Sequence, residues 1–128
     1  MDRLILMPVK VENSDRGWIF NCPDIERSFK LSNLYLGSIN PGEIRGNHYH
    51  EAKTEQVVFL SGKAKIAIEG AEGGLRIERE VEIKSPMIWE IGPFEAHAIK
   101  NVGNVPLIFG FWEESYGSDK VEKVVIES

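Results

Sequence analysis

Turn residues divide this 128-residue chain so finely that they constrain its fold more than any other feature. Glycine or proline recurs roughly every eight to twelve residues, which is the spacing of a β-sandwich or β-barrel. No window of a dozen residues carries the 3.6-residue apolar period of an amphipathic helix. Between the breaks apolar and polar residues alternate, so that Ala64, Ile66 and Ile68 would share one face of a strand. The sequence therefore predicts an all-β, antiparallel fold of two layers, and closure into a jelly-roll barrel would remove exposed strand edges.

The same alternation places the individual strands. Asn40-Pro41-Gly42 ends one expected strand, Ser61-Gly62 ends another, and Gly92-Pro93 separates two more. The expected strands cover residues 4–7 continuing through 9 and 11, 31–40, 56–60, 63–68, 75–83, 86–91, 98–102, 107–112 and 121–126. A chain of this length has room for one domain, so we expect a single domain over residues 1–128.

Charge and composition argue against several classes of function. The formal net charge of −5 argues against nucleic acid as a partner. The longest apolar stretch, residues 105–112, is far shorter than the roughly 18 residues that span a bilayer. The N-terminal residues lack the pattern of a signal peptide, and the single cysteine, Cys22, cannot form an internal disulfide. We expect a cytoplasmic protein that binds neither nucleic acid nor membrane.

All three histidines of the chain lie where a metal ion could use them. Residues two apart in a strand point to the same face, so His48 and His50 would aim both imidazoles into one space while Tyr49 points away. Glu55 leads an otherwise apolar strand face, where a carboxylate is costly to bury unless it is paired or bound to metal. With His97, three imidazoles and one carboxylate would suit a divalent ion, with ligand distances of about 2.0–2.2 Å for zinc. Zinc is the first expectation for the metal, and iron, manganese or nickel would also suit these ligands.

These residues carry a resemblance to a known superfamily. The run from Gly42 through His48, His50 and Glu55 to Gly62, residues 42–62, resembles the first signature motif of the cupins at every position. The resemblance implies the cupin fold, an antiparallel double-stranded β-helix that forms a jelly-roll barrel. It says much less about the reaction, because a fold alone does not fix function.

The second cupin motif is present in part, over residues 92–101. His97 and Asn101 fit it, but Gly92-Pro93 stands one step out of place. Phe94 stands where the motif has a glycine, which puts the backbone of this turn in question.

A narrower resemblance concerns residues 38–50, residues 98–103 and Phe111-Trp112. These are similar to the C-terminal cupin domain of capsular polysaccharide assembling proteins, which carries zinc, acts on keto-sugar nucleotides as an epimerase and stands next to a reductase domain. The pattern that starts at Arg45-Gly46 also resembles dTDP-keto-sugar isomerases, relatives of the deoxysugar epimerases. Because this chain lacks the reductase domain, we expect a separate protein to supply the keto-sugar.

The resemblance implies a metal-binding epimerase or isomerase of keto-sugar nucleotides in polysaccharide or deoxysugar biosynthesis. Such a reaction needs a base that removes a carbon-bound proton and an electrophile that stabilises the enolate, a role a Lewis-acid metal can take. If the histidines are ligands, the base must be another residue, and the candidates are Glu95, Tyr49 and Tyr35. Arg45 and Lys53, near the first motif, could bind the diphosphate of the substrate.

Another class of stand-alone metal cupin stays open as an alternative. It could be an oxygenase, such as a dioxygenase, for which Fe(II) would be the metal, or a non-catalytic module that binds a sugar or another small molecule. Small single-domain cupins commonly dimerise through terminal strands. We therefore expect a homodimer in which residues 121–126 cross to the partner sheet.

Overall fold

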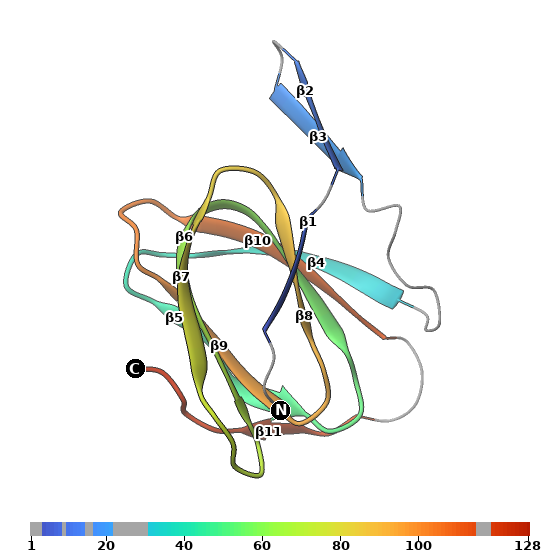
Figure 1. The fold of residues 1–128 in the computed structure, drawn as a ribbon, viewed down its shortest axis with the longest axis vertical. Coiled ribbons are helices and arrows are strands. Elements are labelled where there is room, and N and C mark those ends of the chain that lie inside the picture. The colour runs from blue at the N-terminus through green and yellow to red at the C-terminus, as the bar shows by residue number, and fades with distance from the viewer. Residues whose placement is uncertain (1–3, 9, 15–16, 22–30, 115–118) are drawn as a thin grey trace.

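The computed structural model describes residues 4–8, 10–14, 17–21, 31–114 and 119–128. Within these ranges every regular element is a β-strand, and all strand pairs are antiparallel, which confirms the predicted fold class (Figure 1). The strands are β1 (Ile5–Pro8), β2 (Lys10–Ser14), β3 (Gly17–Asn21), β4 (Leu31–Ile39), β5 (Ile44–His50), β6 (Glu55–Gly70), β7 (Ile77–Ile83), β8 (Met87–Ile91), β9 (Glu95–Asn101), β10 (Leu107–Glu114) and β11 (Val121–Lys123). No described segment forms a helix long and apolar enough to cross a membrane.

The strand β6 belongs to both layers of the barrel. Its first part pairs with β8 and β10, and its second part, from Gly62 onward, pairs with β7 and β9. The sequence predicts two strands here, and the structure joins them into one strand of 16 residues. Gly62 has a φ of 118°, and a Cβ at this position would lie 2.8 Å from Leu107 Cδ1, so glycine lets the strand pass from one layer to the other.

Two layers result from this arrangement. One contains β1, β8, β10, β4 and the first part of β6, and the other contains β7, β9, β5, β11 and the second part of β6. The strands β2 and β3 form a separate hairpin that projects from the barrel in Figure 1. Of this hairpin the sequence alternation predicted only the start of β2, and it missed β3.

The core lies between the two layers and is built from alternating residues of both. The predicted inward face of Ala64, Ile66 and Ile68 is confirmed, because all three side chains are fully buried. Trp89, also fully buried, stacks on Phe59 with ring centroids 6.4 Å apart. The other buried members of this core are Ile39, Val57, Val81, Ile83, Ile91, Ile99, Leu107 and Phe109.

The C-terminal segment packs along β5. β11 pairs with β5 in the same chain, with Val121 opposite His50 and Lys123 opposite His48, and it is shorter than the predicted strand 121–126. Beyond β11, the side-chain oxygen of Asn47 accepts hydrogen bonds from the backbone N–H groups of residues 126 and 127, at 2.9 and 3.1 Å. The homodimer stays a prediction, and Cys22 lies outside the described residues.

Candidate metal centre

A bulge in β5 sets the direction of the first histidine. The pairing of β5 with β9 shifts register between Gly46 and His48, and His48 then lies opposite His97. Gly46 has a φ of 100° and Asn47 a φ of 57°, a region that glycine and asparagine tolerate better than other residues. A Cβ on Gly46 would lie 2.7 Å from His97 O, so glycine also allows the two strands to approach each other at the site.

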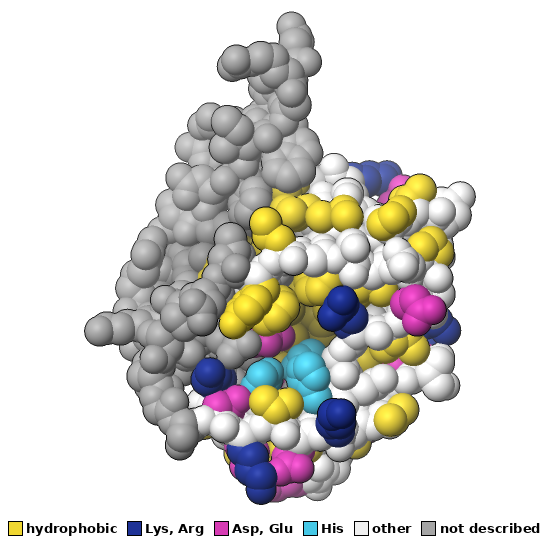
Figure 2. All heavy atoms as spheres, turned by 180° about the vertical axis from the view of Figure 1, so that it is seen from behind, with side chains coloured by type: hydrophobic (Ala, Val, Ile, Leu, Met, Phe, Trp, Pro, Cys, Tyr) yellow, Lys and Arg dark blue, Asp and Glu magenta, His cyan; other side chains and the backbone are white. Residues whose placement is uncertain are grey.

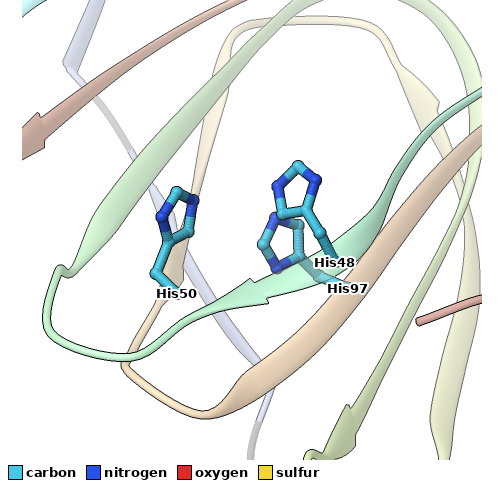
Figure 3. A group of neighbouring side chains, drawn as sticks. All are labelled: His48, His50 and His97. Carbon is cyan, nitrogen blue, oxygen red and sulfur yellow. The ribbon is translucent and has the colours of Figure 1, made fainter. Parts of the chain in front are cut away.

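The three imidazoles converge, as Figure 3 shows. One ligand nitrogen from each of His48, His50 and His97 lies within 4.8 Å of the others. The ring centroid of His48 lies 5.3 Å from that of His50 and 4.6 Å from that of His97. The predicted convergence of His48 and His50 on one space is therefore what the structure shows, and the cluster could bind a metal ion.

Glu55 closes the group from the start of β6. Its Oε2 lies 3.3 Å from His50 Nε2, and its Oε1 lies 3.6 Å from His97 Nε2. His50 and Glu55 are each 6% exposed and His97 is 2% exposed. Within the described part of the chain, the buried Nε2 of His50 meets no hydrogen-bond partner of good geometry. A buried polar atom without a partner is costly, so this nitrogen and its neighbours fit a divalent cation of the zinc type.

The outer nitrogens of two imidazoles have acceptors. His50 Nδ1 lies 2.7 Å from Asp119 Oδ2, and His97 Nδ1 lies 3.0 Å from the backbone oxygen of Glu95. In a neutral imidazole whose Nδ1–H donates to such an oxygen, Nε2 carries the lone pair that a metal needs. Sequence reasoning missed Asp119, which lies 69 residues from His50 and belongs to neither cupin motif.

Burial and neighbouring charges shift the pKa values of His50, His97 and Glu55 in different directions. The neighbouring Glu55 carboxylate, helped by Asp119, raises the pKa of His50 to about 9 against the effect of burial. Burial lowers the pKa of His97 to about 4. Burial also raises the pKa of Glu55, but the adjacent imidazoles, His50 first, outweigh it and the net pKa is lowered. Without a metal, His50 is thus a cation between two carboxylates, and binding of a metal ion would release its proton.

A cavity of about 140 Å³ opens onto the cluster. Figure 2 shows histidine side chains in a hollow that hydrophobic and basic side chains border. The lining residues are Arg45, Gly46, His48, Glu55, Val57, His97, Ile99, Phe109 and Phe111. Arg45 also borders a second, more polar cavity of about 390 Å³, formed by residues 38–40 and 43–45. The site therefore has a buried polar end, apolar walls and a cationic rim.

The three candidate bases do not line this cavity. Tyr35 is 47% exposed and stacks on Phe111, with ring centroids 4.8 Å apart. Tyr49 is not among the residues that line the cavity, and its ring centroid lies 5.9 Å from that of Phe94. Glu95 is 5% exposed, and its Oε1 accepts a hydrogen bond of 2.6 Å from the backbone N–H of residue 92. The contact between Tyr35 and Phe111 puts Tyr35 next to the cavity wall.

The two candidate phosphate-binding residues lie in different places. Arg45 lines the cavity, as described above. Lys53 is not among the lining residues. Burial raises the pKa of Asp119, but the hydrogen bonds that Asp119 accepts from His50 and from the backbone N–H of Ala52 outweigh burial, and the positive charge of Lys53 adds to the lowering.

The turn of the second motif has a left-handed residue at the position where the motif has a glycine. Phe94 has a φ of 59°, in the left-handed region that a bulky residue rarely adopts. Its backbone N–H donates to His50 O at 2.8 Å, which ties the turn to the histidine cluster. Asn101, the last residue of the motif, is 1% exposed, and its side-chain amide donates to Ile39 O and Val105 O at 2.8 and 2.7 Å. The hydrogen bonds of Phe94 and Asn101 thus hold the two ends of the segment that carries His97.

Comparisons with known proteins agree with this architecture. Residues 13–123 match the model of the polysaccharide biosynthesis C-terminal domain. A curated relative, the UDP-2-acetamido-2,6-beta-L-arabino-hexul-4-ose reductase of Pseudomonas aeruginosa, is 32% identical over 73 residues, which are 57% of this chain and 20% of the relative. The capsular polysaccharide assembling protein CapF of Staphylococcus aureus superposes with a TM-score of 0.60 at 23% identity, over 88% of this chain and 30% of CapF. This chain thus spans about a fifth of the one protein and under a third of the other.

Smaller solved proteins match over most of their length. The dTDP-6-deoxy-D-glucose-3,5-epimerase RmlC of Legionella pneumophila, in complex with dTDP-4-keto-L-rhamnose, has a TM-score of 0.75 at 15% identity, over 93% of this chain and 72% of RmlC. The sugar 3,4-ketoisomerase QdtA of Thermoanaerobacterium thermosaccharolyticum, in complex with TDP, has a TM-score of 0.73 at 17% identity, over 92% of this chain and 85% of QdtA. These likenesses confirm the fold expected from the first motif. The chain belongs to the polysaccharide biosynthesis C-terminal domain family and has the cupin jelly-roll fold.

Proposed function

We propose that this chain binds one divalent metal ion, zinc in the first place, and epimerises or isomerises a keto-sugar nucleotide in polysaccharide or deoxysugar biosynthesis. The observation that carries the proposal is the convergence of His48, His50, Glu55 and His97 at the end of a cavity, with the buried His50 Nε2 3.3 Å from Glu55 Oε2 and in no hydrogen bond of good geometry among described residues. Support for the substrate class comes from the family and from fold neighbours that act on dTDP-sugars or hold TDP.

Different residues around the cluster would bind different parts of the sugar nucleotide. A bound divalent ion would supply a Lewis acid that polarises the carbonyl oxygen of the sugar. Val57, Ile99 and Phe109 line the cavity with apolar surface, and an apolar wall that excludes water strengthens electrostatic interactions inside. Arg45 at the rim would bind the diphosphate, because a guanidinium can donate two parallel hydrogen bonds to phosphate. Lys53, on the segment that leads into β6, would be a further cation for the nucleotide.

The base that removes the carbon-bound proton would be one of the three candidates, Glu95, Tyr49 and Tyr35. Glu95 is buried and its carboxylate is held by the turn at residue 92, and Tyr49 lies beside Phe94 and does not line the cavity. Tyr35 stacks on Phe111 at the wall of the cavity. We therefore take Tyr35 as the base to test first. Tyr35→Phe keeps the stacking ring and removes only the hydroxyl, so it separates proton transfer from packing.

A second candidate function has an observation in its favour. Among the described residues that line the cavity, Arg45 is the only polar side chain beyond the proposed metal ligands. A cavity of this kind would suit a module that binds a sugar nucleotide without converting it. Under that reading the chain would present the nucleotide to another enzyme.

Incubation with nucleotide keto-sugars in deuterated water tests the proposal. The zinc-loaded chain is mixed with dTDP- and UDP-linked 4-keto-sugars, and mass spectrometry follows deuterium at the carbons next to the ketone. We expect exchange in the wild type, none in His48→Ala, and roughly 100-fold slower exchange in Tyr35→Phe. Binding of the nucleotides without exchange would establish the binding module instead. The absence of both nucleotide binding and deuterium exchange would refute both candidate functions.

A further inference from the structure

Asp119 makes a contact for which neither cupin motif accounts. Its Oδ2 lies 2.7 Å from His50 Nδ1, on the side of the ring opposite to the Nε2 that faces Glu55. Both side chains are buried, with 7% of the Asp119 side chain and 8% of the His50 side chain exposed. A buried carboxylate at this distance accepts a strong hydrogen bond and fixes both the tautomer and the rotation of the ring.

The chain holds Asp119 in place by several independent bonds. Its second oxygen, Oδ1, accepts a hydrogen bond of 2.9 Å from the backbone N–H of Ala52. The next residue, Lys120, accepts a backbone hydrogen bond of 2.9 Å from Glu51 N–H through its carbonyl oxygen. β11 then pairs with the His48–His50 part of β5. The carboxylate is therefore held by the surrounding backbone, and each of its two oxygens has its own partner, Oδ2 the His50 ring and Oδ1 the Ala52 N–H.

The two buried imidazoles of the cluster differ in what holds their outer nitrogen. His97 Nδ1 meets a backbone oxygen, which no substitution can remove. His50 Nδ1 meets a side chain, and that side chain comes from the C-terminal segment rather than from β5, β6 or β9. The orientation of His50 thus depends on a residue that can be changed without changing any proposed ligand.

We propose that Asp119 is a positioning residue of the metal centre, which holds His50 with Nε2 directed at the ion. This inference rests on the metal site proposed above. Loss of a partner of this kind weakens metal binding by roughly 10- to 100-fold in other proteins. The same loss is expected here, although Asp119 itself would not contact the ion.

The test compares Asp119→Asn with Glu122→Gln in the full chain. Asparagine has one acceptor oxygen in place of two, so either His50 Nδ1–H or Ala52 N–H would face an amide N–H group. Glu122 is the matched control, because it lies in the same segment and its carboxylate contacts Lys120 at 3.1 Å. The Zn²⁺ dissociation constant is measured by competition with a chelator of known affinity. NMR of the zinc-loaded protein then follows the Nδ1–H protons of His50 and His97.

We expect Asp119→Asn to bind zinc 10- to 100-fold more weakly than the wild type, and Glu122→Gln to bind within twofold of it. The Nδ1–H proton of His50 should exchange rapidly in Asp119→Asn, while that of His97 stays protected. Asp119→Glu, which keeps the charge, should restore part of the affinity. Equal zinc affinity in Asp119→Asn and Glu122→Gln would overturn this inference and leave the metal site standing. Failure of the wild type to bind zinc would instead refute the metal site, and this inference with it.

Discussion

The turn at Phe94 offers a sharp test of how this chain builds the second motif. Phe94 has a φ of 59°, and its backbone N–H donates to His50 O, so the left-handed conformation is coupled to the cluster. At most positions glycine is less stable than alanine by roughly 0.5–1 kcal/mol, because it loses more backbone freedom on folding. At Phe94 we predict the opposite order, with Phe94→Gly more stable than Phe94→Ala.

The magnitude follows from two opposing effects. A non-glycine residue in the left-handed region costs roughly 1–2 kcal/mol, a cost that alanine keeps and glycine removes. The greater flexibility of glycine in the unfolded chain offsets roughly 0.4–1 kcal/mol of that gain. Both variants lose the ring contact between Phe94 and Tyr49, so this loss cancels in the comparison. We therefore expect the free energy of unfolding of Phe94→Gly to exceed that of Phe94→Ala by about 1 kcal/mol.

Urea denaturation of the metal-free chain measures this difference directly, with the slope checked for equality between the variants. For a chain of 128 residues, 1 kcal/mol corresponds to roughly 3–5 °C in the midpoint of thermal unfolding. If Phe94→Ala is as stable as Phe94→Gly or more stable, the left-handed turn is not a source of strain and the reasoning about this motif is wrong.

Two further predictions concern the bulge and the C-terminal segment. Gly46→Ala should destabilise the chain by at least about 3 kcal/mol and abolish zinc binding, because its Cβ would lie 2.7 Å from His97 O. Gly42→Ala is the control, since its φ is also positive, at 83°, but no atom lies within 4 Å of its Cβ; an equal cost for both would contradict the close approach. Glu127 has a lowered pKa, chiefly because it accepts a hydrogen bond from Lys65. Its contribution to stability is therefore present above the pKa that it has in the unfolded chain. This contribution is lost as the pH falls through the pKa that Glu127 has in the folded chain. Glu127→Gln should therefore lower the thermal midpoint at pH 7 and match the wild type near pH 3, whereas a constant difference across this range would argue against the ion pair.

The proposed metal ligands could be read from the sequence because strand geometry is local. His48 and His50 share a strand face by their spacing, and the structure brings their rings together as that spacing predicts. The place of Glu55 followed from the same argument, as a carboxylate at the head of an apolar face. Such inferences need only the period of a strand and the cost of burying charge.

Other features depend on contacts that no local pattern records. Asp119 meets His50 only because β11 returns to β5, and nothing in the sequence around Asp119 indicates a partner 69 residues away. The alternation at residues 56–68 predicts two strands because Gly62 looks like a turn, whereas tertiary packing against Leu107 turns it into a bend within one strand. Glu95 follows a proline-containing turn and was a candidate base, yet its buried carboxylate accepts a hydrogen bond from the backbone N–H of residue 92, a contact that the sequence around it does not indicate.

X-ray absorption spectroscopy of the zinc-loaded chain tests the central claim most directly. If His48, His50, His97 and Glu55 bind one ion, the spectrum should show one zinc per chain with three imidazole nitrogens and a carboxylate oxygen at about 2.0–2.2 Å. His48→Ala should lose the ion or show one imidazole fewer. Zinc that is absent after loading, or a zinc environment that is unchanged in His48→Ala, would contradict the account.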